Sequence, residues 1–129
     1  MNDNKKTNLK PLIAVVDDDS SLRESTQLLL RSAGYRAEVF ASAQEFLDSP
    51  QIEETACLIL DVRMPGMDGL ELQRSLNEAQ KQIPIIFITA HATENEEKCA
   101  RQAGAVDFLR KPMYDVKLLS AIQIALKEG

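Results

Sequence analysis

Five polar side chains stand at or just beyond the ends of short apolar runs in this chain, and together they could hold a metal ion. Asp17 and Asp18 follow the run at 12–16, and Asp61 follows the run at 57–60. Thr89 follows the run at 85–88, and Lys111 comes shortly after the run at 105–109. The carboxyl ends of parallel strands lie together at one edge of an open α/β sheet, so these side chains would meet in one pocket. Three carboxylates placed together repel one another unless a divalent cation joins them. The sequence therefore predicts a divalent-cation site beside a hydroxyl and an amine.

The cation that suits such a pocket is Mg²⁺, because it prefers carboxylate, carbonyl and water oxygens. The chain has a single histidine, which excludes a transition-metal cluster built on histidines. It also lacks the GxxxxGK and GxGxxG phosphate-binding motifs, and an acidic first loop would repel a cofactor phosphate. Nucleotide and flavin binding are therefore not expected.

Each candidate residue also has an ordinary structural explanation. The acidic pair and its neighbour Asp19 would be favoured at a helix N-terminus by the helix dipole, and for Asp19 we expect only that role. Asp61 could start a turn, and Asp68 in the following loop is assigned to a turn or a cap. Thr89 could be an ordinary strand residue, and Lys111 could be a solvated surface residue. It is the combination of all five positions that favours a site.

The elements that must position these residues alternate between strand and helix. Three continuous apolar runs, at 12–16, 57–60 and 85–88, predict strands buried on both faces, as in a parallel sheet covered by helices. Two further strand candidates, 36–40 and 105–109, carry charged residues, which are better placed at the edges of a sheet. The expected fold is α/β and flavodoxin-like: a doubly wound, five-stranded parallel sheet with strand order 2-1-3-4-5 and five helices.

Helix boundaries are marked by capping residues. Three capping boxes, in which a hydroxyl and a later glutamate satisfy free amides, predict helix starts: Ser21 with Glu24, Ser42 with Glu45, and Thr93 with Glu96. Gly34 and Gly104 fall where helices should end, because glycine readily adopts the left-handed conformation found there.

The last two helices differ in how firmly they should pack. The helix at about 94–103 offers only Cys99, Ala100 and Ala103 as apolar residues, so we expect it to be held less firmly than its neighbours, as a moving part would be. The final helix carries an apolar stripe at helical spacing, formed by Leu118, Leu119, Ile122, Ala125 and Leu126.

Length and composition indicate one domain. The chain has 129 residues with a net charge of −5, which argues against a nucleic-acid-binding surface in this domain. Cys57 and Cys99 form no CxxC pair, and we expect both to be structural and the compartment to be reducing. No apolar stretch approaches the ~20 residues of a membrane span. We expect a flexible, polar tail at 1–10 and a single domain at 11–129.

Four segments carry a family resemblance: VVDDD at 15–19, LILDVRMPGMDGLEL at 58–72, PIIFITAHA at 84–92 and AGAVDFLRKP at 103–112. In order and spacing they resemble the receiver domain of two-component response regulators, over nearly the whole chain from about residue 12 onward. In such a domain an aspartate accepts a phosphoryl group from the phosphohistidine of a sensor histidine kinase or a phosphotransfer protein. A cytoplasmic, phosphorylation-operated signalling switch is thus the expected function.

The resemblance also implies individual roles. The phosphoacceptor falls on Asp61, and the Mg²⁺ ligands fall on Asp17, Asp18, Asp61 and the backbone carbonyl of Arg63. The phosphate-sensing hydroxyl falls on Thr89, the lysine on Lys111, and the switch positions on Thr89 and Phe108. A cis peptide is implied between Lys111 and Pro112.

A rival function, hydrolysis of small phosphomonoesters through an aspartyl phosphate, is disfavoured. Such enzymes need a second aspartate two residues after the nucleophile as a general acid. That position is Arg63, which cannot act as one.

The residues of these segments are similar to those in receivers of regulators with a LuxR-type helix-turn-helix output. We therefore expect control of transcription through a DNA-binding domain. A stand-alone receiver that acts through protein–protein contacts is the alternative. We also expect phosphorylation to promote homodimers through the helix at about 94–103 and the fifth strand. In that switch, Thr89 moves toward the phosphate and Phe108 turns inward into the vacated space.

Overall fold

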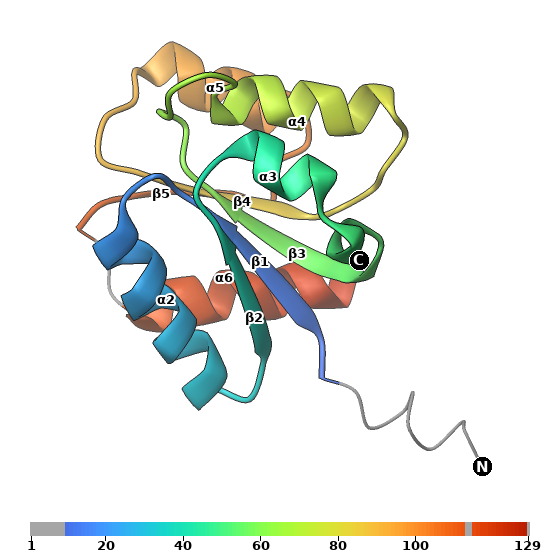
Figure 1. The fold of residues 1–129 in the computed structure, drawn as a ribbon. Helices are drawn as coiled ribbons and strands as arrows, with labels where there is room; N and C mark the ends of the chain where they lie inside the picture. The colour runs from blue at the N-terminus through green and yellow to red at the C-terminus, as the bar shows by residue number, and fades with distance from the viewer. Residues whose placement is uncertain (1–9, 113–114, 129) are drawn as a thin grey trace.

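The computed structural model describes residues 10–112 and 115–128, and within them a parallel sheet is covered by helices on both faces (Figure 1). The five strands are β1 (Leu12–Val16), β2 (Arg36–Phe40), β3 (Thr55–Leu60), β4 (Ile85–Thr89) and β5 (Asp107–Arg110). All pairings are parallel, and the order is β2-β1-β3-β4-β5. This is the predicted order, with the two charged strands at the edges.

Uniform burial identifies the central strands. Every residue of β1 and β4 is buried, and so is all of β3 except Ala56. Alternate residues along each strand point to opposite faces, so these three strands supply two separate cores. This explains why the apolar runs show no polar alternation.

Five α-helices and one short 3-10 helix complete the described fold: α2 (Ser20–Ser32), α3 (Ala43–Asp48), η1 (Pro50–Glu54), α4 (Gly69–Glu78), α5 (Glu94–Gln102) and α6 (Asp115–Glu128). Helices α2 and α6 cover one face of the sheet, and α3, α4 and α5 cover the other (Figure 1). The η1 turn was not predicted from the sequence.

Two of the three predicted capping boxes need correction. Thr93 and Glu96 do form a reciprocal box at the start of α5. Ser42 caps α3, but the Glu45 carboxylate accepts from the backbone N–H of Ala41 instead of that of Ser42. The box with Ser21 is absent, because α2 begins at Ser20.

Helix α2 is capped two residues earlier than expected. The side chain of Asp19 accepts hydrogen bonds from the backbone N–H groups of Ser21 and Leu22, so Asp19 is the N-cap. At the far ends of helices, Gly34 and Gly104 have φ values of 97° and 105°, as expected.

Helix α5 contributes little to the core. Ala100 is its one buried residue, while Cys99, for which we expected a structural role, is exposed. Cys57 is fully buried in β3. The expected loose packing of this helix therefore has a clear basis in burial.

No helix of the described residues is long and apolar enough to cross a membrane. Apart from Lys10, the tail expected at 1–10 lies outside the described residues.

Candidate functional site

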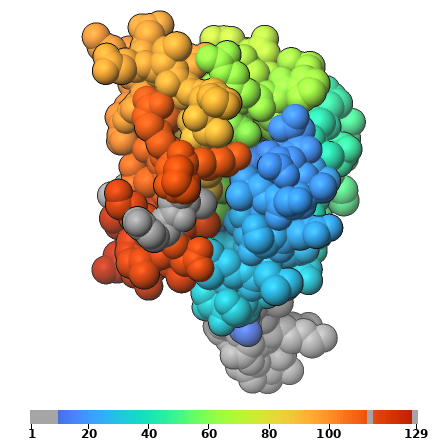
Figure 2. Space-filling model, turned by 90° about the vertical axis from the view of Figure 1, so that its left-hand side faces the viewer, coloured from blue at the N-terminus to red at the C-terminus, as the bar shows by residue number. Residues whose placement is uncertain are grey.

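Three carboxylates converge at the carboxyl edge of the sheet. One side-chain oxygen each from Asp17, Asp18 and Asp61 lies within 4.8 Å of the other two. Asp17 and Asp61 are buried, whereas Asp18 is exposed. Figure 2 views the molecule from this side, where segments coloured blue, green and orange, far apart in sequence, lie side by side.

Hydrogen bonds hold Asp17 in place. Its backbone N–H donates to the carbonyl of Phe40 at 3.2 Å, and its Oδ1 accepts from the N–H of Asp19 at 2.9 Å. Its carbonyl accepts from Nη1 of Arg23 at 2.7 Å. Burial raises the pKa of the Asp17 carboxyl, and the nearby charge of Asp61 adds to this rise. The Asp19 N–H and the ammonium of Lys111 oppose it.

Lys111 reaches the carboxylates from the end of β5. Its Nζ lies 3.4 Å from Oδ2 of Asp17 and 3.6 Å from Oδ2 of Asp61. Its backbone N–H donates to the carbonyl of Thr89 at 2.9 Å, and the Lys111–Pro112 peptide is cis. The single ammonium thus offsets part of the charge of three carboxylates.

Asp61 is held by hydrogen bonds from both its backbone and its side chain. Its N–H donates to the carbonyl of Val16 at 3.1 Å, and its Oδ1 accepts from the N–H of Arg63 at 3.2 Å. On the other side, Gly69 packs so closely that a Cβ on this residue would collide with the Asp61 carbonyl oxygen. Only glycine therefore fits at the first residue of α4.

The Thr89 hydroxyl bonds within its own loop. It donates to the carbonyl of His91 at 3.1 Å and accepts from the His91 N–H at 3.3 Å. Thr89 is buried at the carboxyl end of β4, next to Lys111, the first residue after β5. This places the hydroxyl at the same edge as the carboxylates, as the sequence predicted.

Phe108 already lies inside the protein. The residue is buried, and its ring centroid is 5.6 Å from that of Phe87 on β4. In this structure the ring already points inward, and the switch role of Phe108 on phosphorylation stays a prediction. The guanidinium of Arg110 lies over the ring, 5.5 Å from its centroid.

An ion pair joins the loop after β3 to helix α5. Nη2 of Arg63 lies 2.8 Å from Oε1 of Glu96, and Nε of Arg63 donates to the carbonyl of His91 at 3.2 Å. These two contacts hold the Arg63 side chain against α5 and the loop before it.

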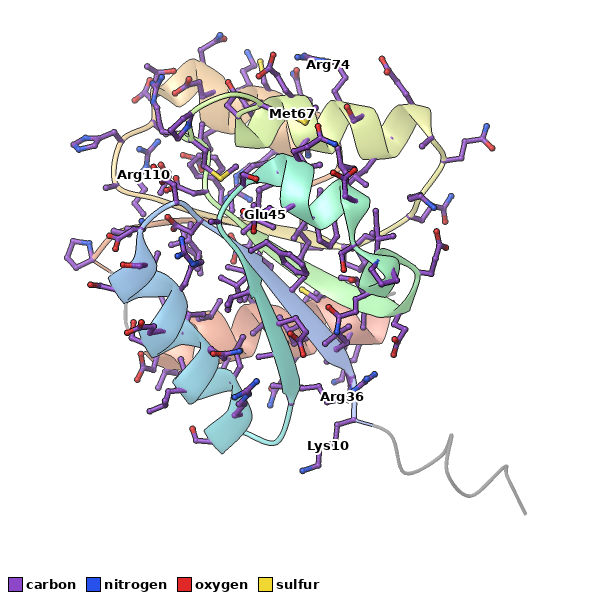
Figure 3. The ribbon with its side chains drawn as sticks, in the orientation of Figure 1. Lys10, Arg36, Glu45, Met67, Arg74 and Arg110 are labelled. Atoms are coloured by element: carbon purple, nitrogen blue, oxygen red, sulfur yellow. The ribbon has the colours of Figure 1, made fainter. Side chains whose placement is uncertain are left out.

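Further ion pairs link α5 to β5. Arg110 contacts Glu97 at 2.9 Å and donates to the carbonyl of Ala92 at 2.8 Å, and Figure 3 shows its position near this loop. Arg101 contacts Glu97 at 3.1 Å and Asp107 at 3.3 Å. Hydrogen bonds from Arg110 and then Arg101 hold the pKa of Glu97 below its ordinary value.

The C-terminal end of α5 is fastened to α4. Nε2 of Gln73, a buried side chain, donates to the carbonyl of Ala100 at 3.0 Å, and Nδ2 of Asn77 donates to the carbonyl of Ala103 at 3.1 Å. Polar contacts at both ends, more than apolar burial, hold this helix in place.

The donor set of the acidic cluster fits a hard divalent cation. Three carboxylates supply only oxygen ligands, which is the preference of Mg²⁺. Chemically, the arrangement offers a cation site, a buried carboxylate nucleophile at Asp61, and an ammonium beside it.

Sequence reasoning missed three residues that shape the site. Arg23 bonds to the Asp17 carbonyl, Gly69 packs on Asp61, and Glu96 pairs with Arg63. An arginine near a helix N-terminus was the available signal for Arg23. The other two contacts depend on how separate loops meet, which no local pattern encodes.

Comparisons with known proteins identify the family. A family described as the response regulator receiver domain matches residues 13–123. Response regulator protein TodT of Pseudomonas putida is 47% identical over 116 residues, 90% of this chain and 51% of TodT. Transcriptional regulatory protein FixJ of Bradyrhizobium diazoefficiens is 40% identical over 117 residues, 91% of this chain and 57% of FixJ.

A solved structure gives the same answer. The structure of response regulator StyR superposes with a TM-score of 0.83 at 47% identity, covering 92% of this chain and 60% of StyR. The chain therefore belongs to the response regulator receiver domain family, and it is a receiver domain of the two-component type. It spans about half the length of the curated relatives that it matches.

Proposed function

We propose that Asp61 is the phosphoacceptor of this receiver domain, and that it takes its phosphoryl group from the phosphohistidine of a sensor histidine kinase or phosphotransfer protein. A carboxylate oxygen of Asp61 attacks phosphorus, the phosphorus–nitrogen bond breaks, and the departing imidazole takes up a proton. The observation that carries this proposal is the convergence of Asp17, Asp18 and Asp61 around the amine of Lys111.

Asp17, Asp18 and Asp61 would hold Mg²⁺, and the backbone carbonyl of Arg63 is proposed as a further ligand. When bound, the ion neutralises charge on the phosphoryl oxygens during transfer. Lys111 lies close enough to pair with Asp61 before transfer and with the phosphoryl group afterwards. Thr89, now bonded to His91, is the hydroxyl proposed to turn toward that group.

Incubation with acetyl phosphate and Mg²⁺, followed by intact mass measurement, tests the assignment. The wild type should gain one phosphoryl group, and Asp61→Asn should gain none while keeping its far-ultraviolet circular dichroism. Asp68→Asn is the matched control, because Asp68 caps α4 outside the cluster. Full phosphorylation of Asp61→Asn would assign the nucleophile elsewhere.

The output surface proposed is that of α5 and β5, which phosphorylation would prepare for homodimer formation. Few buried side chains restrain α5, and Thr89 stands at the start of the loop that leads into it. Thr89 and Phe108, which is buried here on β5, are the proposed switch residues that link the site to this surface. Sedimentation with and without beryllofluoride and Mg²⁺ should show monomers shifting toward dimers.

Control of transcription through a LuxR-type helix-turn-helix domain is the proposed output, and relatives such as FixJ, a transcriptional regulatory protein, support it. The net charge of −5 is consistent with a domain that does not itself bind nucleic acid. We place the protein in the cytoplasm, where phosphotransfer from a kinase occurs. A stand-alone receiver is the alternative, and the reading frame downstream in the gene distinguishes the two.

A further inference from the structure

One arginine outside the acidic cluster contacts its backbone. Nη1 of Arg23 donates to the carbonyl of Asp17 at 2.7 Å, the shortest of the hydrogen bonds that hold the loop between β1 and α2. The backbone N–H of the same arginine donates to the carbonyl of Asp19 at 3.0 Å. Arg23 therefore brackets Asp18, with its side chain on the residue before and its backbone on the residue after.

The position of this arginine is electrostatically unfavourable for the helix. Arg23 is the fourth residue of α2, where the positive end of the helix dipole disfavours a cation. Helical side chains lean toward the N-terminus, so from this position the guanidinium can pass back over the first turn to the loop. The hydrogen bond to the Asp17 carbonyl therefore stabilises a cation at a position that the helix dipole disfavours.

We propose that Arg23 is a positioning residue for the divalent-cation site, holding the Asp17 carbonyl so that the side chains of Asp17 and Asp18 stay directed at Asp61 against their mutual repulsion. This rests on the proposed role of the three carboxylates as cation ligands. Asp17 is almost fully buried, and Asp18 is exposed. The guanidinium sets the course of the backbone between them.

The sign of a substitution separates this role from plain electrostatics. Removing a positive charge near a cation site, by itself, strengthens cation binding. Loss of a contact that orients the ligands weakens it, and removing such outer contacts typically lowers metal affinity about 10- to 100-fold. Arg23→Gln should therefore weaken Mg²⁺ binding about tenfold even though its charge change acts in the opposite direction.

Two variants and one control make the experiment. Arg23→Gln removes the charge and shortens the side chain so that it no longer reaches the Asp17 carbonyl. Arg23→Lys keeps the charge, but its Nζ ends one bond short of the Nη1 position. Arg74→Gln makes the same charge change on the exposed side of α4, away from the acidic cluster (Figure 3). Isothermal titration with MgCl₂ at neutral pH and fixed ionic strength gives the dissociation constants. Thermal unfolding in EDTA tests each fold separately.

The expected result is weaker Mg²⁺ binding for both Arg23 variants, unchanged binding for Arg74→Gln, and unfolding midpoints close to wild type. Mg²⁺ affinity of Arg23→Gln equal to or tighter than wild type overturns the proposal. If Arg23→Gln does not fold, Arg23→Lys decides, and wild-type affinity in that variant overturns it. Failure of the wild type to bind Mg²⁺ at all would instead overturn the proposed cation site.

Discussion

The guanidinium of Arg63 pairs with the carboxylate of Glu96 at 2.8 Å, so the loop that follows Asp61 is tied to the helix that follows Thr89. The tie is reinforced by the bond from Arg63 Nε to the His91 carbonyl. Two segments 33 positions apart in sequence are thus joined directly over the carboxyl edge of the sheet.

Arg63→Ala should loosen the segment from His91 to Glu97 without unfolding the protein. The Arg63 side chain is 55% exposed and that of Glu96 is 22% exposed, so solvent screens the pair and its loss should cost less than about 1 kcal/mol of unfolding free energy. Amide hydrogen exchange in that segment should nevertheless accelerate, because two contacts that restrain it are gone. Arg36→Ala is the control: it breaks the exposed pair with Glu54 near Lys10, at the opposite edge (Figure 3), and should leave this segment unchanged.

Mg²⁺ should raise the thermal unfolding midpoint, because it relieves repulsion among three carboxylates. At ~100 times its dissociation constant, mass action contributes about 2.7 kcal/mol. Asp61→Asn should raise the midpoint of the metal-free protein by removing one of the repelling charges, and should shrink the Mg²⁺-dependent rise. Scanning calorimetry in EDTA and in MgCl₂ measures both, and an unchanged wild-type midpoint would refute the cation site.

Gly69→Ala should destabilise the fold by about 1–3 kcal/mol, the usual range for forcing an extra group into a packed position. Alanine favours helix over glycine, so propensity alone predicts a gain, and any loss reports the clash with the Asp61 carbonyl. Glu94→Ala, at the exposed first residue of α5, is the control and should change little. Urea unfolding compares them; a neutral or stabilising Gly69→Ala would contradict the close approach.

Glu97 should make the protein sensitive to acid over a defined range. Its pKa is lowered in the folded state by Arg110 and Arg101, so its contribution is present above the ordinary value of 4.5 and is lost as pH falls through the folded-state pKa. Glu97→Gln should be slightly less stable than wild type at neutral pH, by less than about 1 kcal/mol because solvent screens the pair. The gap should close below the folded-state pKa, and Glu94→Gln should show no such gap.

The two cysteines should react at very different rates. Burial raises the pKa of Cys57 to about 12, while Cys99 is exposed on α5. A thiol reagent at neutral pH should label the native protein once, at Cys99, and a second time only on unfolding, since the thiolate is the reactive form. Cys99→Ser should abolish the fast label. Rapid double labelling of the folded wild type would show that β3 opens readily.

The division into central and edge strands could be predicted because the information is local, and the flavodoxin-like fold then supplied the full order. Runs such as 12–16 and 85–88 are apolar at every position, and only a strand covered on both faces tolerates that. The charged residues of β2 and β5 then had to lie at the edges, as they do.

The details of the site depended on contacts that local patterns do not determine. Ser21 was a plausible cap, but Asp19, two residues earlier, accepts from the backbone N–H groups of Ser21 and Leu22 and so starts the helix before it. Phe108 could be placed on an edge strand, yet its inward packing on Phe87 follows from the parallel register of β4 and β5. The contacts of Arg23 and Gly69 likewise appear only when loops from different strands meet.

Helix α5 places one small side chain, Ala100, in the core and is otherwise held by polar contacts at its two ends. Its outward residues between those ends therefore carry almost none of the free energy of folding. Substitutions there can change the surface that a partner would contact while the sheet and the acidic cluster stay intact. The proposed output surface and the proposed phosphotransfer site can therefore change independently of each other.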